Sequence, residues 1–528
     1  MNKRKNKRKN KRKNKRNRIA GLVLIGILSI SSVHMVAANT EGNILMIGQS
    51  SEITSLDPIA GAATLQKERT SITEGLVTCD DNFEIQPWLA ESWEMKDDLT
   101  WTVKLREDVM FHDGTPFNAE ALKWCVDRLL STESSVKDVA DIKEVNIVDE
   151  FTVEFVTNNK NTELMACFFN PDFCIYAPSS VDENGEFDTL IGTGPFAFES
   201  FDASTGELTA VPFDGYWGAK PSVEKLVMKT YTDANTRALA LETGEINFAA
   251  DVPFAEIDNL SSIDNLVVDI EPGARAYQAI YNTLEEPAAD VNVRKALAYA
   301  TDQETIVDSA LEGVGLVANG PLPESMAWCD TSLEGYAYDT DKALALLAEA
   351  GYTDSDGDGL LDKDGEVLTI NILTYTSRPG LPLIAQSMQS DFSKIGIQAN
   401  IEVLDWSQYA DRRAERAFDI ALESNTTAYI PSVSFYFEQY FASTSGANTC
   451  GYNNPEFDKL IADCKATNIT EEKYEYSKQM QQMVNDDLPV FTVAFYSTVF
   501  VYDQSVKNFV FNPASHDYII PSNIAIEN

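Results

Sequence analysis

Histidine is scarce in this sequence: three histidines occur among 528 residues, and only His112 and His516 lie beyond residue 38. Imidazole is the usual acid–base group of hydrolases and a frequent ligand of transition metals, so both kinds of site have few candidates. The sequence also lacks a Gly-x-Ser-x-Gly elbow, a His-Glu-x-x-His motif and a Walker loop. We therefore expect a protein that is not an enzyme and has no catalytic residues, with a secreted hydrolase built on paired carboxylates as a remote alternative.

Basic residues are few as well. The chain has 41 Lys and Arg against 82 Asp and Glu, and twelve of the basic residues lie in residues 1–38, which contain no acid. The remainder therefore has 29 basic against 82 acidic residues, a net charge of −53. Such a surface repels phosphate backbones, so we expect no nucleic acid among the partners.

Cys-x-x-Cys pairs are absent too, which leaves a zinc or redox site without support. The seven cysteines are an odd number, so at least one stays unpaired even where disulfides form outside the cell. Cys125 lies within a helical pattern, and we expect it to be a buried thiol.

Residues 1–38 are predicted to be a signal peptide. Near-identical Asn-Lys-Arg-Lys units form a basic start, residues 19–33 are apolar and uncharged, and Val36-Ala37-Ala38 offers small residues for cleavage before Asn39. The uncharged run is also about long enough to span a bilayer, so an uncleaved anchor is the alternative. We expect a secreted protein, in the periplasm or on the outer face of the cell membrane.

Length and patterning predict a mixed α/β protein of several compact units. A chain of 528 residues is too long for one ordinary core. Residues 99–105 alternate between apolar and polar, as in a half-buried strand, and Asn118 then precedes an amphipathic helix over residues 119–130 as its N-cap. Other helices are predicted to end at Gly244, Gly351 and Gly396.

Several phrases of the sequence occur in the order of one known family. The longest stretch runs from Pro87 to Leu130 and contains PWLAESW, TWTVKLREDVMF and DGTPFNAEAL. The shorter ones are Leu56-Asp57-Pro58, Gly192-Thr193-Gly194-Pro195-Phe196, VRKALAYATDQETIV from Val293, and the runs at 346–351 and 452–458. Together they resemble the extracellular solute-binding proteins that feed ABC importers, in the peptide and nickel branch, family five.

The resemblance implies a two-lobed periplasmic-binding-protein clamshell with an extra inserted subdomain. The first lobe would be residues 39–275, with 84–190 inserted, and would be completed by 499–528; the second would be 276–498. The lobes would close on a small peptide or a metal (nickel) chelate and deliver it to ABC permease subunits in the membrane. The implied protein is a monomer that requires no cofactor. A ligand sensor or peptide chaperone on the same fold is the alternative.

The segments that line the cleft in this family contribute nine candidate ligand-binding residues: Arg275, Tyr277, Arg378, Trp406, Tyr409, Asn425, Thr426, Thr427 and Tyr429. The aromatic residues suit the walls of a cleft, the amide and hydroxyl groups could form hydrogen bonds, and an arginine could bind a ligand carboxylate through two nitrogens. Peptide-binding relatives often carry an acid near the position of Thr427, so this threonine weakens an oligopeptide assignment. Residues 374–383 look more like the nickel branch, which gives a slight preference for a chelate.

A separate acidic loop resembles a calcium site. Asp354, Asp356 and Asp358 fall at positions 1, 3 and 5 of a calcium-binding loop, Gly359 at position 6 and Asp362 at position 9. Position 12, where a bidentate glutamate belongs, is a glycine. The loop therefore predicts a structural calcium ion of modest affinity, with a solvated acidic turn as the alternative.

Overall fold

The computed structural model describes residues 42–527, apart from residues 54, 61–68, 133, 135 and 188. The predicted signal peptide, residues 1–38, lies outside the described residues. Residues 40–528 form one compact unit, so the predicted lobe boundaries stay a prediction. No helix within the described ranges has both the length and the apolar character needed to cross a membrane.

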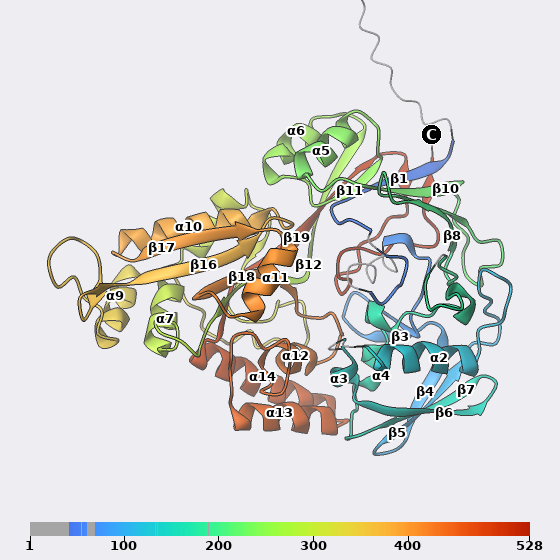
Figure 1. The fold of residues 1–528 in the computed structure, drawn as a ribbon, viewed down its shortest axis with the longest axis horizontal. Coiled ribbons are helices and arrows are strands. Elements are labelled where there is room, and N and C mark those ends of the chain that lie inside the picture. The colour runs from blue at the N-terminus through green and yellow to red at the C-terminus, as the bar shows by residue number, and fades with distance from the viewer. Residues whose placement is uncertain are drawn as a thin grey trace, which may run out of the picture. The chain divides into compact units, whose positions relative to one another are not determined.

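The described part of the chain is built around one large mixed sheet (Figure 1). Along its path the strand order is β17-β16-β18-β12-β19-β11-β1-β10-β9-β8, with β13 pairing beside β19. The bounds are β1 Ile44–Gln49, β8 Phe196–Asp202, β9 Glu207–Pro212, β10 Lys225–Thr230, β11 Phe248–Ala250, β12 Leu266–Tyr281, β13 Leu316–Val317, β16 Thr369–Tyr375, β17 Gln398–Leu404, β18 Ile420–Thr426 and β19 Val490–Asp503. The mixed α/β class predicted from the sequence is thereby confirmed.

Two long strands join the halves of this sheet. β12 and β19 run antiparallel, and their pairing extends from Leu266 opposite Asp503 to Ile280 opposite Val490. β19 is buried along nearly its whole length, which is the pattern of a strand covered on both faces. Across the sheet, β11 and β1 follow on the β19 side of this pair, and β18 and β16 follow on the β12 side.

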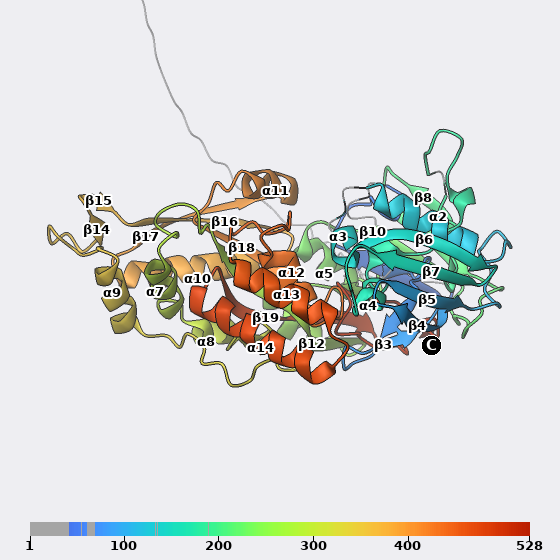
Figure 2. The ribbon, with the colours of Figure 1, turned by 90° about the horizontal axis from the view of Figure 1, so that it is seen from below.

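Residues 84–190, predicted to be an inserted subdomain, contain a second sheet of order β4-β5-β7-β6, which lies far from β16 and β17 in both ribbon views (Figures 1 and 2). Its strands are β4 Ala90–Asp97, β5 Thr100–Leu105, β6 Ile142–Asp149 and β7 Thr152–Thr157. The predicted strand over 99–105 is confirmed except at Leu99, which lies in the hairpin turn and is 40% exposed. Helix α2, Ala119–Leu130, begins as predicted: the Asn118 side chain accepts a hydrogen bond from the Ala121 backbone N–H at 3.1 Å.

Further helices cover the sheets and connect the strands. Their bounds are α3 Val136–Ala140, α4 Leu164–Cys167, α5 Ala234–Glu242, α6 Ile257–Ser261, α7 Val291–Tyr299, α8 Gln303–Thr305, α9 Thr340–Glu349, α10 Gly380–Lys394, α11 Trp406–Ala414, α12 Phe435–Phe441, α13 Pro455–Ala466 and α14 Thr470–Asp487. Short strand pairs are β2 Val77–Cys79 with β3 Ile85–Pro87, β14 Asp362–Lys363 with β15 Glu366–Val367, and β20 Val506–Lys507 with β21 Ala525–Ile526. Helices α5, α9 and α10 end near Gly244, Gly351 and Gly396, whose positive φ angles of 71°, 92° and 79° favour glycine, as predicted.

All seven cysteines are free thiols, and Cys125 is buried in α2 as expected. Burial raises the pKa of the Cys125 thiol to about 12, so the thiol stays protonated at neutral pH.

Candidate ligand-binding site

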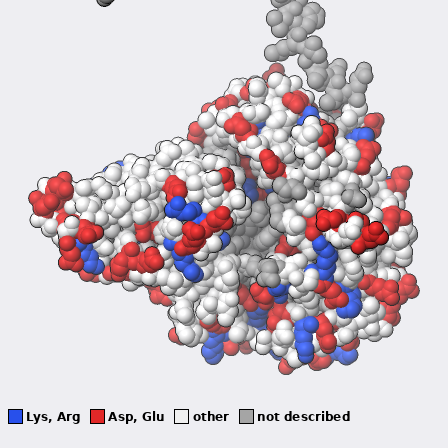
Figure 3. All heavy atoms as spheres, in the orientation of Figure 1, with Lys and Arg blue, Asp and Glu red and all other residues white. Residues whose placement is uncertain are grey.

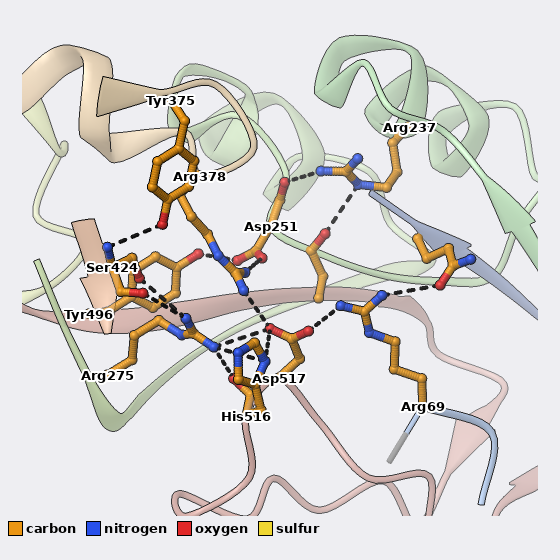
Figure 4. A network of polar contacts seen from close by, with 12 residues as sticks. Arg69, Arg237, Asp251, Arg275, Tyr375, Arg378, Ser424, Tyr496, His516 and Asp517 are labelled. Carbon is orange, nitrogen blue, oxygen red and sulfur yellow. Dashed lines mark hydrogen bonds and ion pairs between the residues drawn. The ribbon is translucent and has the colours of Figure 1, made fainter. Parts of the chain in front are cut away.

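Three arginines converge on one buried carboxylate, Asp517 (Figure 4). Arg378 Nη2 lies 2.8 Å from Asp517 Oδ1, and Arg275 Nη2 lies 3.5 Å from the same oxygen. Arg69 donates a hydrogen bond to the other carboxylate oxygen, Oδ2. The three guanidinium groups come from distant parts of the chain, and the C-terminal segment brings the carboxylate to them.

Arg378 also contacts a second acid. It lies in the loop between β16 and α10, and its Nη1 donates to Asp251 Oδ2 at 2.7 Å. Asp251 directly follows β11 and accepts a further hydrogen bond from the Tyr496 hydroxyl on β19. Arg378 thus reaches from the predicted second lobe to two acids of the predicted first lobe.

The cluster shifts the pKa values of its members. Burial alone would lower the pKa of Arg378 and raise that of Asp517, but the neighbouring opposite charges outweigh it. Asp517 and Asp251 hold the pKa of Arg378 well above its usual range, and Arg69 and Arg378 hold that of Asp517 well below. Burial and the nearby Arg275 charge lower the pKa of His516 to about 4, so its imidazole is neutral at pH 7. Three guanidinium groups therefore contact the two carboxylates through their side chains, and a fourth, that of Arg237, donates to the Asp251 backbone oxygen.

This local excess of positive charge contrasts with the outer surface. Acidic side chains spread across most of the face in Figure 3, while basic side chains gather in fewer places. An anion that passes this acidic surface would meet preorganised guanidinium donors in a low-dielectric environment, where such contacts are strongest.

The structure brings together several residues that were predicted to bind ligand. Arg275 on β12 donates to the Ser424 backbone oxygen at 3.2 Å and lies 3.1 Å from His516 Nδ1. The ring of Tyr277 lies 5.0 Å from that of Tyr496, and its hydroxyl, in a side chain 1% exposed, has no hydrogen-bond partner among the described residues.

Among the residues predicted at and just after the end of β18, Tyr429 contacts the cluster directly. The ring of Tyr429 lies 5.0 Å from that of His516, and Asn425 donates to Gln278 Oε1 and Glu423 Oε2, each at 3.2 Å. The Thr427 hydroxyl donates to the Ala274 backbone oxygen at 2.8 Å, so it ties this turn to β12. The buried Thr426 hydroxyl has no partner in the described part of the chain.

Trp406 and Tyr409 form a neighbouring aromatic group with Tyr375. Their rings lie 5.0 and 4.9 Å from the Tyr375 ring, whose hydroxyl accepts from the Ser424 backbone N–H at 3.2 Å. Trp406 is 53% exposed, as a wall residue would be. Tyr409 is fully buried and donates to Glu423 at 2.6 Å, so in this structure it packs in the core. A ligand role for any of these residues stays a prediction.

Sequence reasoning missed five members of the cluster: Arg69, Asp251, Tyr496, His516 and Asp517. No local motif marks them, because they lie in four separate segments that only the folded chain brings together. The one available signal is a charged residue next to apolar neighbours, as in Ala250-Asp251-Val252 and Asp517-Tyr518-Ile519. That signal is weak because many surface acids share it.

The acidic loop before β14 lies on the exposed surface. Carboxylate oxygens of Asp354, Asp356 and Asp358 lie within 4.8 Å of one another. Asp354 also accepts hydrogen bonds from the Gly357 and Gly359 backbone N–H groups at 2.7 and 3.1 Å. Asp362 instead accepts from the Ser355 backbone N–H at 3.0 Å. A calcium ion at this loop stays a prediction.

Comparison with known proteins supports the fold and identifies the family. Residues 84–448 match the family described as bacterial extracellular solute-binding proteins, family 5 middle. The chain is 27% identical over 485 residues to the glutathione-binding protein GsiB of Salmonella typhi, covering 89% of this chain and 92% of that one. It is 28% identical over 476 residues to the dipeptide-binding protein of Escherichia coli K12, covering 84% and 86%.

A solved structure agrees with these sequence matches. The crystal structure of the nickel ABC transporter from Bacillus halodurans is 29% identical and superposes with a TM-score of 0.73 over 92% of this chain and all of that one. The family match spans more than half of the chain, and the fold is that of two-lobed periplasmic binding proteins. The chain therefore belongs to the bacterial extracellular solute-binding proteins of family 5.

Proposed function

We propose that this chain captures a small carboxylate-bearing solute, either a small peptide or a nickel chelate, and delivers it to the permease subunits of an ABC importer. The observation that carries the proposal is the position of Arg378, whose guanidinium faces Asp251 and Asp517 while Arg275 lies beside it. Relatives in the family are named for binding glutathione, dipeptides and nickel, and peptides and chelates both present carboxylates.

The proposed mechanism is exchange of carboxylates at the cluster. A guanidinium offers donors in a planar fork that fits a carboxylate, so an incoming ligand carboxylate would take the place of Asp251 or Asp517 at Arg378. The long strands β12 and β19 are the connections about which the lobes would close. Closure would then present one defined surface to the permease.

The cluster supports a slight preference for a chelate over a peptide. A peptide brings a cationic amino terminus that needs a carboxylate partner, and Thr427 stands where peptide-binding relatives often have an acid. The nearby Glu423 is buried and already pairs with Arg413 and Tyr409. If carboxylates make up most of the polar surface of a chelate, the arginines alone could bind it.

Arg378→Lys tests the role of the guanidinium. Lysine keeps the positive charge but loses the planar pair of donors, so ligand affinity should fall at least about tenfold, since one charged hydrogen bond contributes about 1.5–3 kcal/mol. The control is Arg412→Lys, because Arg412 pairs with Glu402 on the exposed surface. Calorimetry with solute recovered from protein purified from its own host provides the measurement. An Arg378→Lys variant that binds as tightly as the control would refute the proposal.

Native mass spectrometry of the same material separates the two ligand classes. A single nickel-containing adduct would favour the chelate, and a mixed population of peptides would overturn that preference. A sensor or peptide chaperone on the same fold is the alternative function. A neighbouring gene for a histidine kinase or a chemoreceptor would favour sensing, and genes for a permease and an ATPase would favour transport.

We propose that residues 1–38 direct export of the chain, either as a cleaved signal peptide or as an anchor. The basic start and the apolar run at 19–33 support this proposal. The N-terminal sequence of protein secreted by its host distinguishes the two, because cleavage before Asn39 would make Asn39 the first residue.

A further inference from the structure

A pocket of about 310 Å³ lies beside the arginine cluster and has no part in the site described so far. Apolar side chains line most of it, among them Val77, Trp88, Phe169, Phe511, Ile519 and Pro521. Ligand pockets in proteins are typically about 300–1,000 Å³ and mostly apolar, with a few fixed polar groups. The volume is at the lower end of that range, which suits a single ring or a branched aliphatic group.

The Gly192-Thr193-Gly194 motif packs closely against the segment that lines one side of the pocket. A side chain at Gly192 would place its Cβ 1.9 Å from the Ile72 backbone oxygen, and one at Gly194 would place it 2.0 Å from that of Ser71. Only glycine permits this approach of the two backbones. Thr193 then donates to Glu74 Oε2 at 2.8 Å, so the motif fixes the segment that lines the pocket.

Glu74 lines the pocket but has no capacity left for a ligand cation. Its two carboxylate oxygens accept hydrogen bonds from Trp88 Nε1 at 2.8 Å, the Tyr216 hydroxyl at 2.9 Å and Trp217 Nε1 at 3.2 Å, in addition to Thr193. Burial raises the pKa of this carboxyl. The buried part of the pocket therefore favours an uncharged group, while the second acid of the lining, Asp81, is exposed to solvent.

Thr73 is the polar group that the pocket leaves open. Its side chain is 2% exposed, lines the pocket, and its hydroxyl has no hydrogen-bond partner in the described part of the chain. Burying a hydroxyl without a partner is costly, and native proteins rarely keep one without a reason. A bound group with one hydrogen-bonding atom would satisfy it.

The pocket and the arginine cluster share two segments of the chain. Residues 69–78 carry Arg69 at one end and line the pocket from Ser71 onward, while residues 510–522 carry Asp517 and line the pocket on both sides of it. The two segments are joined by Arg69 to Asp517 and by the Ser71 hydroxyl, which donates to the Ile520 backbone oxygen at 2.6 Å. The pocket and the cluster are therefore neighbours on the same two segments.

We infer that this pocket is a subsite for an uncharged apolar group of side-chain size that carries one hydrogen-bonding atom, on the same solute whose carboxylate meets Arg378 and Arg275. The inference rests on the proposed function for the carboxylate. The inference of an apolar subsite holds for a peptide and for a chelate alike.

p-Cresol and toluene are suitable probes, because they differ by a single hydroxyl. Calorimetric titration of ligand-stripped protein should show saturable one-to-one binding of p-cresol. The affinity for toluene should be about two- to tenfold lower, because toluene lacks one hydrogen bond. Thr73→Val should make the two probes bind equally, and Ile519→Trp, which fills the pocket from a half-buried position, should abolish both. Thr492→Val is the matched control, since Thr492 also buries an unpartnered hydroxyl but lies on β19 away from this pocket.

The subsite would be overturned if p-cresol did not bind. It would also be overturned if p-cresol bound the Ile519→Trp variant and bound the Thr73→Val variant with unchanged affinity. Solute-loaded protein should bind p-cresol at least tenfold more weakly than stripped protein, because the solute occupies the pocket. Equal binding to loaded and stripped protein would overturn the link between the pocket and the solute. The titrations of stripped protein need no peptide or nickel, so failure of the subsite there is distinguishable from failure of the carboxylate proposal.

Discussion

Glu163 should make a large contribution to stability, because it is a buried carboxylate whose partners come from distant segments. It precedes α4, and its oxygens accept from the Val433 and Ser434 backbone N–H groups at 3.3 and 3.2 Å. Lys473 on α14 completes the site at 3.1 Å. These contacts tie the inserted segment to the start of α12 and to α14.

The size of the expected loss of stability follows from the burial of both charges. The Glu163 and Lys473 side chains are 7% and 14% exposed, so removing one leaves the other charged and unpaired in the interior. Breaking a buried pair in this way typically costs about 3–5 kcal/mol. We therefore expect Glu163→Ala to lower the free energy of unfolding by about that amount. The double variant Glu163→Ala/Lys473→Met should lose less than the sum of the single variants.

Urea unfolding followed by circular dichroism measures these differences at constant m-value. The control is Glu475→Ala, which removes an exposed pair with Lys478 on the same helix and should cost less than about 1 kcal/mol. Glu163→Ala within the range of this control, or strictly additive single and double variants, would refute the reasoning.

The pH dependence provides an independent check on Glu163. Burial would raise its pKa, but Lys473 and Ser434 lower it below the ordinary value of 4.5. Its contribution to stability is therefore fully present above pH 4.5 and is lost as the pH falls through the lower pKa of the folded state. Glu163→Gln should remove this part of the acid dependence of unfolding. An unchanged acid profile would contradict the assignment.

Three further predictions concern other parts of the chain. Burial lowers the pKa of both His112 and His516 to about 4, so stability should fall as the pH drops from 6.5 toward 4, measured as the melting temperature; a flat profile would contradict their neutral burial. Millimolar calcium should raise the melting temperature by neutralising Asp354, Asp356 and Asp358, and Asp356→Ala should remove the effect without changing ligand affinity; no response to calcium or chelator would reduce the loop to a solvated turn. Thiol titration should find seven reactive cysteines in denaturant and, in native protein, the half-buried Cys329 first; fewer than seven would reveal a disulfide.

Local patterns in the sequence determined the elements whose stability is local. The strand at Thr100–Leu105, the Asn118 cap and helix α2 follow from neighbouring residues, because alternation, capping and helical periodicity act within a few positions. The same holds for the helix ends at Gly244, Gly351 and Gly396, where glycine accepts a positive φ at little cost. The ordered phrases from Pro87 onward were sufficient to indicate the family.

Only the tertiary structure decided which charged residues meet. Arg69 and Asp517 are 448 positions apart, and Arg378 lies 127 positions from Asp251 and 139 from Asp517. Arg275 and Arg378 were chosen from the sequence, but the acids that hold them were not, because no periodicity relates residues in separate segments. Tyr409 illustrates the same limit: its sequence context does not show that the fold buries it and pairs its hydroxyl with Glu423. The β12–β19 pairing and the return of the C-terminal segment bring these side chains together, and such long-range contacts leave no local trace in the sequence.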